Sequence, residues 1–401
     1  MSFPIMRRMP NDLSFAISSL DTFHLSFPLR YWEEYRSDEA QKGDRFEFTP
    51  GWQTVYARNI ETALCRVKFA DGTTGWGEVN APIGPEVVCL IWKNIVAPVV
   101  AGRTFESPTR LWDFLYDAQR GRGYASGYWL DALAGVDLAV WDALGIRNGK
   151  PVAALIRPDP RKRIPVYLSG IRKATLGERV AEINKWYDDG LRGAKIFLSP
   201  DVDAGLKELD GLRAGCPRLK NWMVDFLWML PAATAARVKA SFGDRGVVFL
   251  ECPLQPEDLA GHRELVGEPG APIALGEHFR TLYQARDWFG PPRALDVYQP
   301  DIGRTGISDG IRQLDAAYDA GLEVTPHMGN GMAVFQAATL HFSALCRPSH
   351  LQEFQYGHYR MSRDIADSAW VYHNGAFDLP DRPGLGVTVR PEALEPFAAR
   401  T

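Results

Sequence analysis

The chain has 401 residues, of which 46% are hydrophobic and 23% are charged, a balance typical of a folded globular protein large enough for two domains. Its formal net charge of −4 provides no broad basic surface, which argues against a nucleic-acid-binding protein. Five cysteines without a CxxC pair favour free thiols, and no apolar run approaches the ~18 residues of a membrane span, so we expect a cytoplasmic protein without a nucleic-acid or membrane partner.

The first 157 residues predict a small α+β domain. Residues 14–28 are strand-like, and residues 62–78 alternate around Asp71-Gly72, a dipeptide typical of a hairpin turn. Residues 130–144 carry apolar side chains at helical spacing, and Gly149-Lys150-Pro151 predicts the end of that helix.

Residues 31–52 are rich in charged residues, glycine, proline and aromatics. This composition is typical of a surface loop, although loops of this length also serve as lids over binding sites. Five polar residues are candidate lid contacts, with a solvated surface position as the favoured interpretation: His24, Arg30, Tyr35, Arg36 and Arg58.

From Arg163 onward, apolar strand-like runs alternate strictly with helical segments. Eight strand candidates lie at residues 164–168, 194–198, 222–225, 247–251, 273–277, 294–301, 323–327 and 351–355. Alternating units of this kind predict a parallel sheet, and eight of them within about 200 residues favour a closed (β/α)8, TIM-like barrel over residues 158–375. An open, doubly wound sheet is the alternative.

Polar residues end seven of these strands. They are Lys195, Asp225, Glu251, Glu277, Asp301, His327 and Glu353. In a barrel the carboxyl ends of the strands converge on one face, where functional groups collect. The acids at 225, 251 and 277 are 26 residues apart in each step, so they would meet there, and their mutual repulsion must be relieved by protonation or by a cation. Hard oxygen ligands of this type favour Mg2+.

A candidate general base lies across from these acids. Asp301 and His327 end the sixth and seventh strands and would be neighbours. A carboxylate beside an imidazole fixes the tautomer of the ring and raises its basicity, so we expect this pair to act as a base.

Several motifs give the chain a specific resemblance to a known family. They are Gly193-Ala194-Lys195-Ile196-Phe197, Met223-Val224-Asp225, Phe249-Leu250-Glu251-Cys252-Pro253, Ala274-Leu275-Gly276-Glu277, Gln299-Pro300-Asp301-Ile302-Gly303-Arg304-Thr305-Gly306, Thr325-Pro326-His327 and Pro380-Asp381-Arg382-Pro383-Gly384-Leu385-Gly386-Val387. In this order and at barrel spacing, they resemble the mandelate racemase subgroup of the enolase superfamily over nearly the whole chain. The resemblance implies a barrel with an N-terminal capping domain, completed by a C-terminal segment over residues 376–401.

The resemblance also implies a chemistry and a set of roles. Enolase superfamily sites are a known example of a Lys or His base that works with Mg2+. A base removes the α-proton of a carboxylate substrate, and the metal stabilises the enediolate that forms. By motif position Asp225, Glu251 and Glu277 correspond to the ligands of one divalent cation, and Asp301 with His327 to the catalytic dyad. Family members are often homo-oligomers, so we expect one here.

Glu353 corresponds by motif position to a residue that hydrogen-bonds the substrate carboxylate or its enediolate. The second strand, in contrast, departs from the family pattern. Many members carry Lys-x-Lys there, with the second lysine as a base, whereas this chain has Lys195-Ile196-Phe197. Lys195 and Phe197 share the inward face because strand side chains repeat every two residues. Phe197 cannot take a proton and Lys195 is better suited as an electrophile, so a reaction served by one base is favoured over racemisation.

Dehydration of an aldonate-type acid sugar to a 2-keto-3-deoxy acid is such a reaction. The sequence Gly276-Glu277-His278 resembles rhamnonate dehydratases, which also lack the second-strand lysine base. His278 is a candidate to bind a substrate hydroxyl or act as a second acid, with a structural role of equal weight. The alternatives are an epimerase or cycloisomerase on the same scaffold and a non-catalytic sugar-acid-binding protein.

Overall fold

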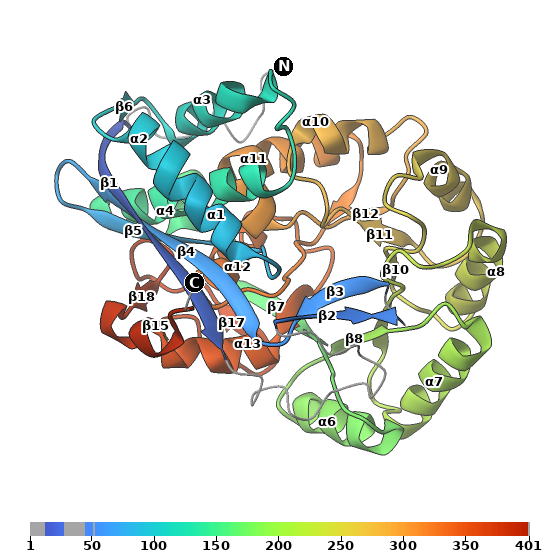
Figure 1. Ribbon diagram of the computed structural model, residues 1–401. Coiled ribbons are helices and arrows are strands. Elements are labelled where there is room, and N and C mark those ends of the chain that lie inside the picture. Colours follow the sequence, from blue (N-terminus) through green and yellow to red (C-terminus); the bar gives the residue numbers. More distant parts are fainter. Residues whose placement is uncertain (1–12, 28–44, 51–52, 400–401) are drawn as a thin grey trace.

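The chain forms an N-terminal capping domain and a barrel domain that lie against each other (Figure 1). The computed structural model describes residues 13–27, 45–50 and 53–399. Within these residues, every helix is too short or too polar to cross a membrane. All five cysteines are free, as the sequence predicted.

The sheet of the capping domain is antiparallel and has the order β5-β4-β1-β6. Its strands are β1 (Phe15–Phe27), β4 (Ile60–Phe69), β5 (Thr74–Val79) and β6 (Thr104–Phe105). The predicted hairpin at Asp71-Gly72 joins β4 to β5, and Gly72 has a φ of 92°, which favours glycine at this turn.

The helices of this domain run from Pro85 to Ile156. They are α1 (Pro85–Ile91), a π-helical turn (Trp92–Val96), α2 (Ala97–Val100), α3 (Pro108–Arg120), α4 (Tyr128–Arg147) and α5 (Val152–Ile156). Helix α4 is buried on nearly all sides because it lies between the capping sheet and the barrel. Its backbone approaches β5 so closely that a Cβ at Gly77 would lie 1.8 Å from the Gly135 carbonyl oxygen.

Eight parallel strands form the barrel: β7 (Arg163–Ser169), β8 (Gly193–Phe197), β9 (Asn221–Asp225), β10 (Leu250–Glu251), β11 (Ile273–Leu275), β12 (Val297–Tyr298), β13 (Glu323–Val324) and β14 (Gln352–Gln355). Hydrogen-bonded ladders join β7 through β13 in sequence order, and β14 pairs with β7. Between β13 and β14 the contact is made by side chains: Thr325 Oγ1 donates to the Leu351 carbonyl and Gln352 Nε2 to that of Pro326. The predicted barrel with a capping domain is confirmed.

Helices surround these strands on the outside. They are α6 (Leu176–Asp188), α7 (Val202–Gly215), α8 (Ala232–Gly243), α9 (Leu259–Gly267), α10 (Leu282–Ala285), α11 (Ile302–Asp319) and α12 (Ala333–Ser343), and α13 (Tyr356–Met361) follows β14. Inside the barrel an apolar layer fills the space beneath the strand ends, formed by Tyr167, Met223, Phe249, Ala274 and Val297. This packed layer makes the carboxyl ends of the strands the floor of any cavity.

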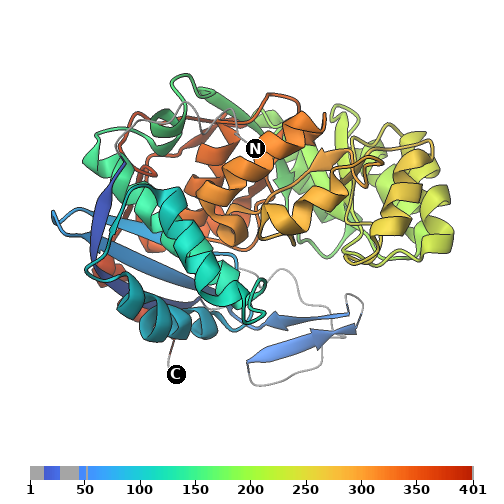
Figure 2. The same cartoon turned by 90° about the horizontal axis from the view of Figure 1, so that it is seen from above.

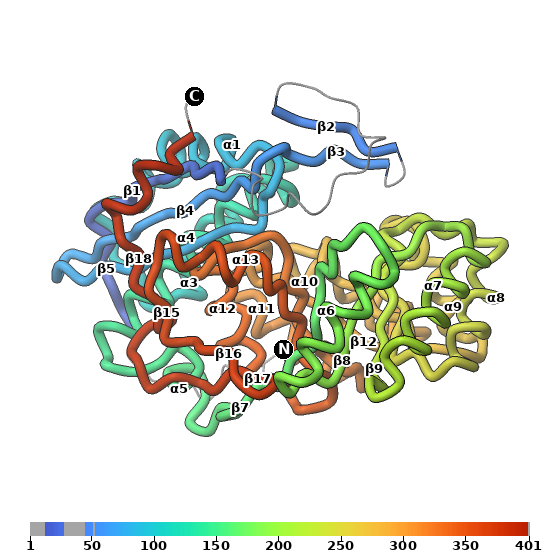
Figure 3. Tube along the Cα trace, turned by 90° about the horizontal axis from the view of Figure 1, so that it is seen from below, coloured from blue at the N-terminus to red at the C-terminus, as the bar shows by residue number. Residues whose placement is uncertain are grey.

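A second hairpin, β2 (Phe46–Thr49) and β3 (Thr54–Ala57), extends from the capping domain across the barrel (Figures 2 and 3). The prediction of a loop over residues 31–52 is therefore wrong at 46–49, where the strand is paired with 54–57. Arg30, Tyr35 and Arg36 lie outside the described residues, and the lid function of the segment stays a prediction.

His24 does not occupy the solvated surface position that the sequence favoured. Its side chain is only 9% exposed, and Nε2 lies 3.4 Å from Glu61 and 4.0 Å from Glu86. Arg45, directly before β2, donates to both carboxylates. The strand pairing of β1 hides His24 from solvent, and this could not be read from the loosely patterned sequence.

The C-terminal segment returns to the capping domain. After β15 (Ala366–Ser368), β16 (Tyr372–His373), β17 (Ala376–Asp378) and β18 (Val387–Val389), the chain reaches β1. There the Ala399 N–H donates to the His24 carbonyl, and Phe397 stacks on Phe27 with ring centroids 4.3 Å apart. Capping domain and C-terminal segment therefore share one core.

Asp142 on α4 ties this segment to the capping sheet. Its carboxylate accepts the backbone N–H of Trp76 at 2.8 Å and that of Leu385 at 2.7 Å, and the residue is 2% exposed. We expect Asp142→Ala to lower the free energy of unfolding by about 2–5 kcal/mol, because two buried N–H donors lose their acceptor. Urea unfolding followed by circular dichroism measures the loss.

The exposed Asp117 provides the matched control. Its ion pair with Arg120 is solvated, so Asp117→Ala should change the unfolding free energy by less than about 0.5 kcal/mol. Equal stability of the two variants would contradict the role of Asp142.

Candidate active site

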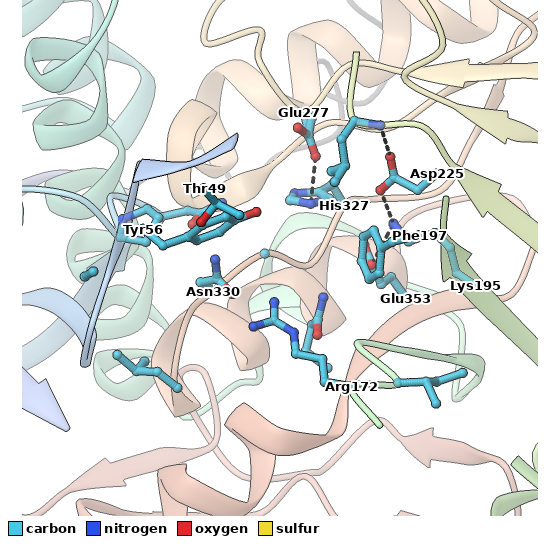
Figure 4. A pocket seen from close by; sticks show the side chains of 18 of the residues that line it. Thr49, Tyr56, Arg172, Lys195, Phe197, Asp225, Glu277, His327, Asn330 and Glu353 are labelled. Atoms are coloured by element: carbon cyan, nitrogen blue, oxygen red, sulfur yellow. Dashed lines mark hydrogen bonds and ion pairs between the residues drawn. The ribbon is translucent and has the colours of Figure 1, made fainter. Parts of the chain in front are cut away.

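A cavity of about 360 Å³ lies between the capping domain and the carboxyl ends of the barrel strands. Its inner wall carries Lys195, Asp225, Glu277, His327 and Glu353, all of which the sequence singled out. Thr49 and Tyr56 of the β2–β3 hairpin face the same cavity (Figure 4). The outer wall is polar and mostly basic, with Arg58, Arg172, Lys173, Arg179, Glu47 and Glu208. The site is thus assembled from both domains.

Lys195 is the central cation of the inner wall. Its ammonium Nζ lies 2.5 Å from Glu251 Oε1, 2.9 Å from Glu353 Oε1 and 3.5 Å from Asp225 Oδ2, and the side chain is 1% exposed. Burial alone would lower the pKa of Lys195, but the carboxylates of Glu251 and Glu353 raise it well above its usual value. The lysine is therefore held as a cation, which fits an electrophile and not a base.

Asp225 and Glu251 offer a site for a divalent cation. They end the paired strands β9 and β10, and oxygens of the two carboxylates lie within 4.8 Å of each other. Burial and, to a smaller extent, the neighbouring charge of Glu251 raise the pKa of Asp225 well above its usual value. The cluster of carboxylates is therefore short of positive charge. Two buried carboxylates with a charge deficit fit a hard cation such as Mg2+.

Glu277, the third predicted ligand, contacts a different partner. Its Oε2 lies 2.9 Å from His327 Nε2, and its Oε1 accepts a hydrogen bond of 3.4 Å from Trp228 Nε1. Although burial opposes ionisation, the His327 cation lowers the pKa of Glu277 below its usual value. A cation bound by Glu277 would compete with His327 for this carboxylate. The complete ligand set of Asp225, Glu251 and Glu277 stays a prediction.

The expected dyad is brought together in the structure. His327 Nδ1 lies 2.7 Å from Asp301 Oδ2, and an isolated parallel bridge joins the backbones of the two residues. Burial opposes the charged form of His327, yet the carboxylates of Glu277 and Asp301 raise its pKa well above the usual value. Because Nδ1 is bound to Asp301, Nε2 is the ring nitrogen that faces the cavity.

Glu353 and Phe197 complete the inner wall. Glu353 Oε2 accepts the Met328 N–H at 2.9 Å, which fixes the carboxylate next to Lys195. Phe197 follows Lys195 on the same face of β8, and its ring centroid lies 5.5 Å from Lys195 Nζ. An aromatic ring therefore lies beside the lysine and lines the same cavity (Figure 4).

His278 lies behind the inner wall. Its ring packs edge-on against Trp228 at 4.6 Å and lies 4.0 Å from the ring of Phe279, and both ring nitrogens are buried. Burial lowers the pKa of His278 to about 3, so the ring is neutral. His278 lies in the turn that follows β11 and is enclosed by these aromatic rings. Its assignment to substrate binding stays a prediction.

Sequence reasoning missed Asn80, the residue after β5, which lies on the cavity wall and contacts Asp301. It also missed the hairpin residues Thr49 and Tyr56. No spacing rule connects these residues to the strand ends, because they come from the capping domain. Only the docking of the two domains places them at the site.

Comparison with known proteins agrees with this architecture. Residues 178–393 match the family described as enolase C-terminal domain-like, and residues 52–157 match the mandelate racemase / muconate lactonizing enzyme N-terminal domain. A D-galactarolactone cycloisomerase from Agrobacterium fabrum is 27% identical, covering 83% of this chain and 90% of the relative. An L-rhamnonate dehydratase from Saccharopolyspora erythraea is 27% identical, covering 92% and 90%. The crystal structure of an enolase superfamily member from Agrobacterium tumefaciens superposes with a TM-score of 0.88 at 30% identity, covering 95% and 98%.

The charge cluster yields a stability prediction. Lys195→Met removes the cation that three buried carboxylates share, and we expect the free energy of unfolding in EDTA to fall by about 3–5 kcal/mol. Chemical denaturation measures it. Lys185→Met on the exposed face of α6 is the matched control and should change stability by less than about 0.5 kcal/mol. A Lys195→Met protein as stable as the wild type would show that the cluster is neutralised in another way.

Proposed function

Because this chain belongs to the enolase superfamily, in its mandelate racemase subgroup, we propose that it is a Mg2+-dependent dehydratase of an acid sugar. The product would be a 2-keto-3-deoxy acid, formed by loss of water from carbons 2 and 3 of an aldonate-type substrate. One observation carries the proposal. A single base, His327 oriented by Asp301, faces the cavity, while Phe197 occupies the second-strand position where a second base would stand.

The cavity wall supports a polyhydroxy acid as the substrate. The outer part is lined by basic and amide side chains that suit hydroxyl and carboxylate groups, including Arg58, Arg172, Asn330 and Gln355. A cavity of about 360 Å³ is of the size that holds a small ligand. Lys195, the buried cation, would contact the substrate carboxylate, and Glu353 in its protonated form would donate a hydrogen bond to the same group.

Asp225, Glu251 and Glu277 would hold the metal ion. When bound, a divalent cation supplies positive charge to a substrate carboxylate, which makes the proton on the adjacent carbon more acidic. If Glu277 binds the metal ion, its carboxylate no longer contacts Nε2 of His327. The imidazole could then act as a neutral base with Nδ1–H held by Asp301.

The steps performed by His327 balance in atoms and charge. Nε2 takes the α-proton, and the C–H electron pair moves into the enediolate of the substrate. The carbon–oxygen bond at the β-position then breaks, and the departing hydroxyl takes the proton back from the imidazolium and leaves as water. The resulting enol ketonises to the 2-keto-3-deoxy acid. One residue thus serves as base and acid in turn, and no second base is needed.

A cycloisomerase is the second candidate, supported by the 27% identity to the D-galactarolactone cycloisomerase. If the β-oxygen belongs to a ring of the substrate, the same proton abstraction opens or rearranges the ring without net loss of water. Mass spectrometry of the product separates the two functions, because only the dehydratase product lacks one water relative to the substrate.

The proposal predicts the outcome of a substrate screen. With Mg2+ present, incubation with a library of sugar acids should form a keto acid from at least one member, detected as a semicarbazone. EDTA should abolish this activity, and added Mg2+ should restore it, because the buried carboxylates need the cation to accept an anionic substrate. Activity that persists undiminished after exhaustive chelation would refute the metal requirement.

The dyad gives a second test. His327→Asn should lower kcat by about 100-fold to about 10,000-fold, since it removes the base and acid but keeps a polar side chain of similar reach. Steady-state kinetics on the substrate found in the screen measures the effect. His350→Asn is the matched control. His350 precedes β14 and pairs with Glu323, away from the cavity lining, so this variant should keep its activity. Full turnover by His327→Asn would exclude His327 as the base.

A further inference from the structure

We propose that Asn80 of the capping domain is a positioning residue for the catalytic base of the barrel. The inference rests on the proposed function only in taking His327 as the base. Asn80 follows β5, is 3% exposed, and is 221 residues distant in sequence from the aspartate that it contacts. Its side-chain amide Nδ2 donates a hydrogen bond of 2.5 Å to Asp301 Oδ2.

Asn80 and His327 donate hydrogen bonds to the same oxygen of Asp301. Asp301 Oδ2 accepts both from Asn80 Nδ2 and from His327 Nδ1, at 2.5 Å and 2.7 Å, whereas Oδ1 of the same carboxylate has no hydrogen-bond partner among the described residues. Two donors on one oxygen fix the rotation of the carboxylate group. Asn80 therefore determines which oxygen His327 meets, and so the orientation of the imidazole ring.

The surrounding backbone is shaped to admit this amide. A Cβ at Gly329 would lie 2.3 Å from Asn80 Nδ2 and 2.9 Å from His327 Cε1, so only glycine leaves room between the amide and the imidazole. A Cβ at Gly303 would lie 2.7 Å from the backbone nitrogen of Asn80, which donates to the Gly303 carbonyl at 3.2 Å. Asn80 is thus held at two points beside the dyad.

Asn80 makes the base dependent on the capping domain. Without the amide, the Asp301 carboxylate has one donor in place of two and can turn about its side-chain bonds. His327 would then sample orientations in which Nε2 no longer points at the α-carbon of the substrate. Since misorientation affects the chemical step more than binding, the effect should appear in kcat and much less in KM.

Two substitutions separate positioning from packing. Asn80→Ala removes the amide and its volume, whereas Asn80→Leu keeps the branched shape and removes only the polar groups. We expect both to lower kcat by about tenfold to 100-fold, with KM within about threefold of the wild type. Asn94→Ala, at an exposed asparagine of the same domain, is the control and should match the wild type. Recovery of kcat in Asn80→Leu would reduce Asn80 to a packing residue, and a rise in KM at unchanged kcat would make it a substrate contact; either result overturns the proposal.

A spectroscopic measurement keeps the test independent of the substrate. The His327 Nδ1 proton, assigned by its absence in His327→Asn, is observed by NMR of protein labelled with 15N-histidine. We expect it to shift and to exchange faster with water in both Asn80 variants but not in Asn94→Ala. An unchanged resonance would refute the positioning role. If no sugar acid is dehydrated, the proposed function fails, yet this resonance still decides the role of Asn80.

Discussion

Charge balance among buried groups at the ends of the barrel strands is the constraint on which the rest of the structure depends. Asp225, Glu251 and Glu353 surround the ammonium of Lys195, and all four side chains are at most 4% exposed. Carboxylates in such a place are costly unless each finds a cation or a hydrogen-bond donor. One lysine cannot satisfy all three, and the raised pKa of Asp225 expresses the deficit. A cluster with this charge deficit fits one further cation.

The same requirement explains why the capping domain and the barrel are joined by polar contacts and not by apolar packing alone. Glu78 of β5 accepts the N–H groups of Met332 and Phe335 at the start of α12, where a helix favours negative charge. Asp137 of α4 accepts from the Ser308 backbone on α11 at 2.9 Å. Glu78 and Asp137 of the capping domain are thus satisfied in part by donors of the barrel domain. Separating the domains would leave these groups unpaired, so the cavity between them keeps a defined shape.

The parts of the site that follow chain periodicity could be predicted from the sequence. Asp225 and Glu251 end β9 and β10, Asp301 and His327 lie three residues beyond β12 and β13, and Glu353 lies within β14. They meet because βα units of similar length repeat the same geometry around one barrel. The contact between Glu277 and His327 could not be foreseen, since the spacing of strand ends does not determine which neighbouring side chain a carboxylate contacts.

The positions of the capping-domain residues at the site could not be predicted from the sequence either. The burial of His24 against Glu61 and Glu86 and the approach of Asn80 to Asp301 follow from packing of elements far apart in the chain. Their sequence neighbourhoods carry no periodic signal that points to the barrel. The position of His278 was predicted only in part. The sequence offered a side chain that points away from Glu277 as one alternative, but it did not predict the contacts with the two tryptophans.

The division between strand ends and capping domain has a chemical consequence. In the proposed mechanism, removal of an α-proton needs only the carboxylate cluster, Lys195 and the dyad, whether the reaction is a dehydration or a cycloisomerisation. What differs between the two proposed reactions is the fate of the β-oxygen of the substrate. The β2–β3 hairpin, with Thr49 and Tyr56, and the outer wall line the part of the cavity away from the carboxylate cluster. Because those residues lie on loops, on the hairpin and on helices α6 and α7, and not on barrel strands, they can change without disturbing the buried charge balance. We therefore propose that the outer cavity selects the substrate, while the inner wall performs the proton transfer.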